Sequence, residues 1–113
     1  MPLGIFKKIR RKTMREGSAA FRRDMAEKIS RQRIKYVTER ENSLETVIGK
    51  EGGFSIKNDF LIVMSDLKVV FRGYIPELDI SELLSNEGAV ITGYDLANGN
   101  VLRTIVAYYV YYR

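Results

Sequence analysis

The stretch that decides the fold is AVITGYDLANGNVLRTIVAYYVYY, residues 89–112. Asn98-Gly99 stands between two runs of β-branched and aromatic residues. This pattern is the strongest short-range signal of a β-hairpin, because both turn residues tolerate positive φ. A two-residue turn would pair Leu96 with Val101, whereas a type I turn with a glycine bulge would shift the pairing by one residue. The sequence leaves both registers open.

The second strand of this hairpin is apolar on both faces, as expected of a strand that is central or covered on both sides. We assign Tyr108 and Tyr112 to the interior. Tyr109 and Tyr111 are assigned to a subunit interface, because Arg103 marks the odd-numbered face as the wetter one. A strand that needs two covers in so small a chain predicts a homo-oligomer, with a two-fold dimer as the commonest form.

Composition places the chain among single-domain globular proteins. It has 113 residues, of which 45% are hydrophobic, enough for one core. The longest apolar run, residues 105–112, is far shorter than the roughly 20 residues of a membrane-spanning helix. No secretory signal is visible. The absence of cysteine is typical of a reducing compartment, so we expect a cytoplasmic protein.

The chain also lacks histidine, which excludes Ser-His-Asp and Cys-His catalysis and zinc sites built on His or Cys. The carboxylates fall at presumed turns and show no spacing that pairs two of them for acid–base chemistry. No calcium-loop pattern is present. We therefore expect a non-enzymatic protein with no catalytic residue, no metal, no cofactor and no small-molecule substrate.

Charge divides the sequence into two parts. Residues 1–41 hold thirteen Lys and Arg against five Asp and Glu, a net charge of +8, whereas residues 42–113 hold six against nine, a net charge of −3. This asymmetry predicts a basic helical arm followed by a β domain. The candidate polyanion-binding residues are Lys7, Lys8, Arg10, Arg11, Lys12, Arg15, Arg22 and Arg23.

The arm has helical periodicity. Residues 3–16 place a short apolar stripe among basic side chains, and Ser18 is a plausible N-cap for a second helix. Phe21, Met25, Ile29 and Tyr36 share one face of that helix. We extend it to about residue 37, although residues 33–39 also fit an edge strand.

The period changes to near two over residues 43–75, which predicts an antiparallel meander. With two-residue turns, one face of its last two strands should meet the helix; that face holds Phe60, Ile62, Met64, Leu67, Val69 and Phe71. The glycine-rich stretch 49–53 lacks phosphate-loop spacing, so it is interpreted as a hairpin turn. Residues 70–74 and 90–94 match at Val, Gly and Tyr, which is interpreted as chance similarity between two strands.

Residues 76–88 carry a helix signature, with Asp79 as N-cap and Glu82 at the capping-box position. The predicted fold is therefore α+β: a basic N-terminal helical region on a curved antiparallel sheet of about six strands, with one short inserted helix.

Function follows from the basic arm. A cationic amphipathic segment binds a phosphate backbone or an anionic membrane, and we place nucleic acid ahead of membrane. The predicted function is a non-enzymatic binding or assembly module whose basic N-terminal helix docks on a polyanion. The alternative is a structural homo-oligomer assembled through its tyrosine-rich sheet, with no nucleic-acid role.

Overall fold

A seven-stranded antiparallel sheet forms the body of the protein, in the strand order β4-β3-β2-β1-β7-β6-β5. The computed structural model describes residues 18–110. The strands are β1 (Arg33–Glu41), β2 (Leu44–Lys57), β3 (Phe60–Ser65), β4 (Lys68–Tyr74), β5 (Asp79–Glu82), β6 (Gly88–Asp95) and β7 (Val101–Tyr109). The α+β class and the antiparallel sheet are confirmed, but the sheet has seven strands, where about six were predicted.

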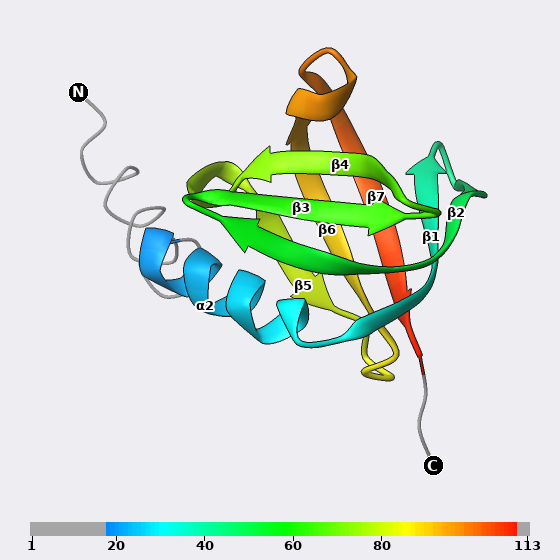
Figure 1. The fold of residues 1–113 in the computed structure, drawn as a ribbon, viewed down its shortest axis with the longest axis horizontal. Coiled ribbons are helices and arrows are strands. Elements are labelled where there is room, and N and C mark those ends of the chain that lie inside the picture. The colour runs from blue at the N-terminus through cyan, green and yellow to red at the C-terminus, as the bar shows by residue number, and fades with distance from the viewer. Residues whose placement is uncertain (1–17, 111–113) are drawn as a thin grey trace.

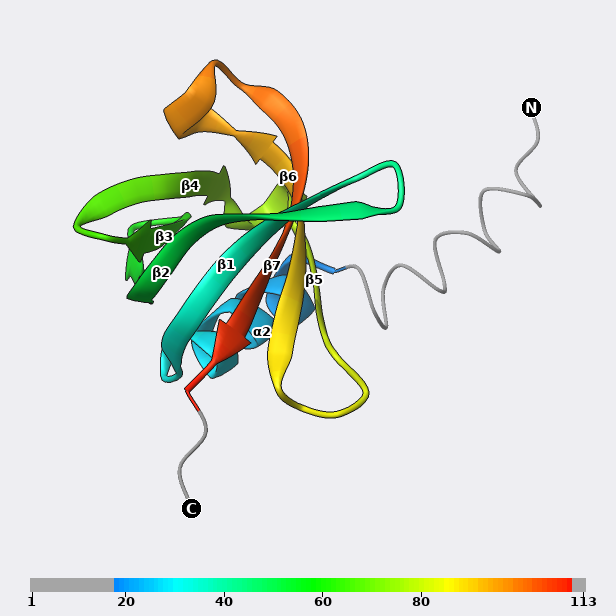
Figure 2. The same cartoon turned by 90° about the vertical axis from the view of Figure 1, so that its right-hand side faces the viewer.

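The sheet bends into two layers. Figure 1 shows the layer of β2, β3 and β4 crossing in front of the layer of β5, β6 and β7, and Figure 2 shows the same two layers from the side. No backbone ladder joins β4 to β6 among the described residues. The sheet is therefore curved and open along one seam.

One α-helix, α2 (Ala19–Ser30), covers an end of the bent sheet (Figure 1). Ser18 caps it as predicted, because its hydroxyl accepts a hydrogen bond of 3.1 Å from the N–H of Phe21. Ala26 and Ile29 are fully buried against the sheet. The helix packs on β2, on β5 and on the 3-10 turn η2 (Ile75–Glu77).

Residues 33–41 form a strand, so the predicted extension of the helix to about residue 37 was wrong. β1 is also central, because it pairs with β2 on one side and β7 on the other. Two ladders outweigh the weak helix preference of a segment rich in β-branched residues. The predicted boundary between residues 1–41 and 42–113 falls inside the β1–β2 hairpin, where Glu41 pairs with Leu44.

The decisive hairpin forms as predicted, in the shifted register. Asp95 pairs with Val101, and the connection contains the 3-10 turn η3 (Leu96–Asn98). Gly99 and Asn100 both have positive φ, at 80° and 59°. This is why the chain needs Gly and Asn at these positions.

The predicted helix in residues 76–88 is absent. Asp79–Glu82 is instead the edge strand β5, which pairs with β6 from Thr92 to Ala89. Leu78 and Ile80 are buried while Asp79 is exposed, the alternation of a strand. A helix this short is marginal by itself, so pairing with β6 decides the outcome.

The glycine-rich stretch is not a turn. Residues 49–53 lie inside the single long strand β2, which continues through a positive φ of 49° at Glu51. A Cβ on Gly49 would collide with the side chain of Ser65, and one on Gly52 would collide with the backbone carbonyl of Met64. These glycines let two strands approach closely.

The meander strands form, but the predicted inward face is only partly right: Phe71 is buried as expected, whereas Phe60, Ile62 and Met64 lie on the other face. Leu61 and Val63 point into the core, where Phe71 from β4 joins them. The opposite face of β3, with Phe60, Ile62 and Met64, points away from the helix. The register places the alternate residues inside, because the turn begins at Asp66 and not at Ser65.

Candidate functional site

The candidate polyanion-binding residues fall into two groups. Lys7, Lys8, Arg10, Arg11, Lys12 and Arg15 lie outside the described residues, so their prediction stays a prediction. Arg22 and Arg23 lie on α2 and can be placed.

Both helix arginines contact the body of the protein. Arg22 donates to the backbone carbonyls of Pro76 and Leu78 at 3.2 and 3.0 Å. Arg23 donates to the carbonyl of Asn58 at 2.8 Å and forms an ion pair with Glu27. These bonds attach α2 to the turns that border it, so both side chains have a structural role.

The charge of the chain divides sharply at the start of the fold. Residues 1–17 hold six Lys and Arg against one Glu, a net charge of +5. Residues 18–113 hold thirteen bases and thirteen acids, so they are neutral overall. The entire net charge of the chain therefore belongs to the segment that precedes α2.

The tyrosine faces of β7 are the reverse of the prediction. Tyr109 belongs to the core, with only 6% of its surface exposed, and its hydroxyl donates to Glu82 at 3.2 Å. Burial and this carboxylate raise the pKa of Tyr109. Tyr108 lies on the outer face, stacked against Tyr36 with ring centroids 4.7 Å apart. Tyr109, which was assigned to a subunit interface, is thus buried within its own chain, and Tyr111 and Tyr112 lie outside the described residues.

An ion cluster bridges the open seam between β4 and β6. The fully buried Asp95 accepts hydrogen bonds from the backbone N–H groups of Arg72 and Ala97, at 3.1 and 3.0 Å, and from the guanidinium of Arg103. Arg103 also binds Glu39 through two nitrogens, at 3.0 and 2.8 Å. These side chains replace the missing backbone ladder.

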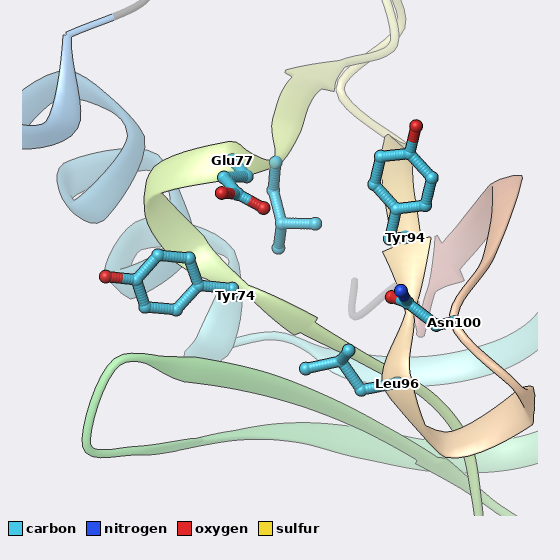
Figure 3. Close-up of a pocket in the computed structure, with 6 residues that line it drawn as sticks. Tyr74, Glu77, Tyr94, Leu96 and Asn100 are labelled. Carbon is cyan, nitrogen blue, oxygen red and sulfur yellow. The ribbon is translucent and has the colours of Figure 1, made fainter.

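The seam also contains a small cavity of about 240 Å³, lined by Tyr74, Glu77, Leu78, Tyr94, Leu96 and Asn100 (Figure 3). Leu78 is buried between Gly73 and Gly93, and a Cβ on either glycine would collide with its side chain. The repeated Val-x-x-Gly-Tyr pattern therefore has a packing reason. Its glycines make room for one leucine, and its tyrosines flank the seam.

A second hollow of about 630 Å³ lies on the outer face of β1 and β2, and its lining includes Tyr36, Thr38, Glu45 and Val47. Glu45 accepts hydrogen bonds of 2.7 Å from both Thr38 and the Tyr108 hydroxyl. These hydrogen bonds lower the pKa of Glu45, and the bond from Thr38 has the largest effect. Burial and the nearby Glu45 carboxylate raise the pKa of Tyr108 to about 12. Lys35, Lys50 and Glu51 also line this hollow, so its acidic and basic side chains are balanced in number.

The lowered pKa of Glu45 predicts a pH-dependent contribution to stability. A carboxylate whose pKa is depressed by folding stabilises the fold above its ordinary value of 4.5, and this contribution is lost as pH falls through the folded-state pKa. Glu45→Gln should therefore destabilise the protein near neutral pH, with a difference that shrinks in acid. Urea unfolding of both proteins across pH measures it. A difference independent of pH would contradict the assigned hydrogen bonds.

The described residues were also compared with the requirements of a metal site and of a membrane-spanning helix. No three acidic side chains in residues 18–110 are grouped so that they could hold a metal ion. No helix within that range has the length and apolar character needed to cross a membrane. Comparison of the chain with family models, with curated proteins and with solved structures found no match in any of the three.

Proposed function

We propose that the protein is a non-enzymatic binding module whose basic N-terminal segment, residues 1–17, docks on a polyanion. The observation that carries the proposal is the position of the charge: all five net positive charges precede a fold that is itself neutral. A concentrated cationic segment gains affinity for a phosphate-bearing surface by releasing its counterions. Such a segment gains nothing comparable from a neutral partner.

The role of the folded part is to present this segment. Because Arg22 and Arg23 are held by carbonyls and acids of the same chain, α2 is anchored on the sheet and the basic segment leaves from its capped start. The polyanion-binding set therefore narrows to the six bases of residues 1–17.

The alternative function, a homo-oligomer assembled through the tyrosine-rich sheet, loses support from one of its two proposed contact residues. Tyr109 is buried in the core and bonded to Glu82, so it offers no surface to a second copy.

Matched charge variants test the proposal. Replacing Arg10, Arg11 and Lys12 with Gln should weaken binding of the full chain to duplex nucleic acid, or to vesicles containing anionic lipid, by about 100-fold. This estimate takes about 1 kcal/mol for each charge near an anionic surface. The control replaces Arg31, Lys35 and Lys50, three exposed bases of the fold, and should bind nearly as wild type. Equal losses in the two triple variants would contradict a dedicated N-terminal site.

A further inference from the structure

The outer face of the β3–β4 hairpin is largely apolar and partly exposed: Met64, Leu67, Val69 and Tyr74 are exposed there, and Phe60 and Ile62 are half-buried. Phe60 pairs with Tyr74, and Met64 pairs with Val69, on the side that points away from the core. We call this surface the hairpin face; it comprises Phe60, Ile62, Met64, Leu67, Val69 and Tyr74. A strand pair with one face in water normally carries polar residues there. A contiguous exposed apolar patch marks an interaction site.

Leu67, at the tip of the hairpin, is an unusual residue for its position in the turn. It is 96% exposed and has a φ of 65°, and Asp66 before it has a φ of 55°. A two-residue turn with both φ values positive favours Asn-Gly, not leucine. Leucine at this position therefore costs backbone energy and contributes no packing. Local rules of this kind are broken mainly at functional sites.

Three basic side chains border the hairpin face, together with two acids in the neighbouring turns. Lys57 lies beside Phe60 on β2, Arg72 lies beside Ile62 on β4, and Lys68 follows the tip. Among the described residues, none of these three forms an ion pair with a carboxylate. The two acids of the neighbouring turns are already engaged. Asp59 pairs with Arg23, and Asp66 accepts the backbone N–H of Lys50.

The edge of this hairpin is closed to an added strand at its middle. The carbonyl of Val70 accepts hydrogen bonds from Asn98 and Arg103, and the N–H of Arg72 donates to Asp95. Side chains of the β6–β7 hairpin thus occupy the β4 backbone that would otherwise template a partner strand. Docking must use the face and not the edge.

We propose that the hairpin face docks on an anionic lipid surface, with Leu67, Met64 and Val69 inserted among the acyl chains and the three cations on the headgroups. The inference rests on the proposed polyanion binding and names its partner. Aliphatic side chains gain free energy in a membrane and offer no stacking surface to a base. The two aromatic rings of the face already contact each other, with centroids 5.5 Å apart. Stable membrane attachment takes two signals, and the basic segment and the hairpin face together supply them.

Leu67→Asn tests insertion without loss of the fold, because Asn tolerates positive φ. The full-length variant should melt at or above the wild-type temperature and bind vesicles of phosphatidylcholine and phosphatidylserine about tenfold more weakly, the value expected for one leucine partly withdrawn from the lipid. Leu84→Asn is the matched control, since Leu84 is a fully exposed leucine on the β5–β6 connection. It should bind as wild type.

A second pair of variants detects contact between the hairpin face and the lipid directly. The chain has no tryptophan, so Val69→Trp places a single reporter on the hairpin face and Leu84→Trp places one elsewhere. Adding the anionic vesicles should shift the emission of the first to shorter wavelength and leave that of the second unchanged. Replacing Lys57, Lys68 and Arg72 with Gln should weaken binding about fivefold for each charge.

The outcomes separate this inference from the function on which it rests. Wild-type affinity in Leu67→Asn, or an unshifted Val69→Trp emission, would overturn docking through the hairpin face. In that case, loss of binding on neutralising Arg10, Arg11 and Lys12 would still support the N-terminal site. Binding to nucleic acid with no binding to vesicles would overturn the lipid partner alone. Absence of binding to either anion would overturn both proposals.

Discussion

Replacing Asp95 with Ala is expected to lower the free energy of unfolding by about 3–5 kcal/mol, the usual result of removing one partner of a buried ion pair. The side chain is fully buried and accepts bonds from Arg72, Ala97, Asn98 and Arg103. Its loss would leave a guanidinium that is only 13% exposed with Glu39 as its one remaining carboxylate. It would also release the bonds that bridge the seam. Urea unfolding measures the change.

Two further variants test whether the loss of stability comes from the buried ion pair of Asp95. Asp79→Ala removes an exposed acid from the outer position of β5 and should change stability by less than about 0.5 kcal/mol. A double replacement of Asp95 and Arg103 by apolar residues should cost less than the sum of the single replacements, because the ion pair between these two residues is lost only once. A loss below about 1 kcal/mol in Asp95→Ala would contradict the role given to this cluster.

Gly52→Ala is expected to destabilise the fold by about 3 kcal/mol, the upper end of the range for overpacking. The added Cβ would collide with the carbonyl oxygen of Met64 on the neighbouring strand. Backbone cannot move aside as a flexible side chain can, so β2 and β3 would have to separate. Thermal or urea unfolding would show the loss.

The adjacent glycine is the control. A Cβ on Gly53 meets nothing within 4 Å, and Gly53 has no positive φ. Gly53→Ala should leave stability unchanged or raise it by up to about 1 kcal/mol, because alanine restricts the unfolded chain. Similar effects of the two substitutions would show that the close approach of β2 and β3 is not what requires Gly52.

Local signals predicted the parts of the fold that depend on neighbouring residues. The turn at Asn98-Gly99 and the Ser18 cap formed where the residue types required them. The hairpin register could not be fixed, because Asn and Gly suit both the two-residue turn and the longer connection. The structure has the longer connection, and Asp95 caps η3 within it.

Elements whose identity depends on distant partners were missed. Residues 33–41 become a strand because β2 and β7 lie on either side, and residues 79–82 become one because the β6 edge is open to them. Neither partner is visible in the local pattern. A short segment with mixed preferences is decided by such pairing and not by its own sequence.

The faces of β7 were reversed by one misleading charge. Arg103 was interpreted as a mark of the solvent side, yet it points inward to Glu39 and Asp95. A buried arginine is stable only when it is paired with an acid. Its two partners come from other strands, and no local pattern in the sequence shows that they lie next to Arg103. The outward Leu67, Met64 and Val69 were misplaced for a related reason. An apolar side chain is normally assigned to a core, and only the structure shows it at a surface.

The candidate site was predicted in part. The concentration of charge before the fold is visible in composition alone. The exclusion of Arg22 and Arg23 from that site needed the structure, because their partners are backbone carbonyls on remote turns.

The most direct test of the account is the salt dependence of binding, measured on the anion that the wild-type chain binds more tightly. Four to six phosphate contacts predict that affinity for a duplex falls about 10²–10³-fold between roughly 50 and 200 mM salt, and a steep fall is likewise expected on anionic vesicles. The full-length variant with Lys7, Lys8, Arg10, Arg11 and Lys12 replaced by Gln should lose most of both the affinity and its salt dependence while unfolding at the wild-type urea concentration. Wild-type affinity and an unchanged salt slope in that variant would contradict the central claim that residues 1–17 carry the binding.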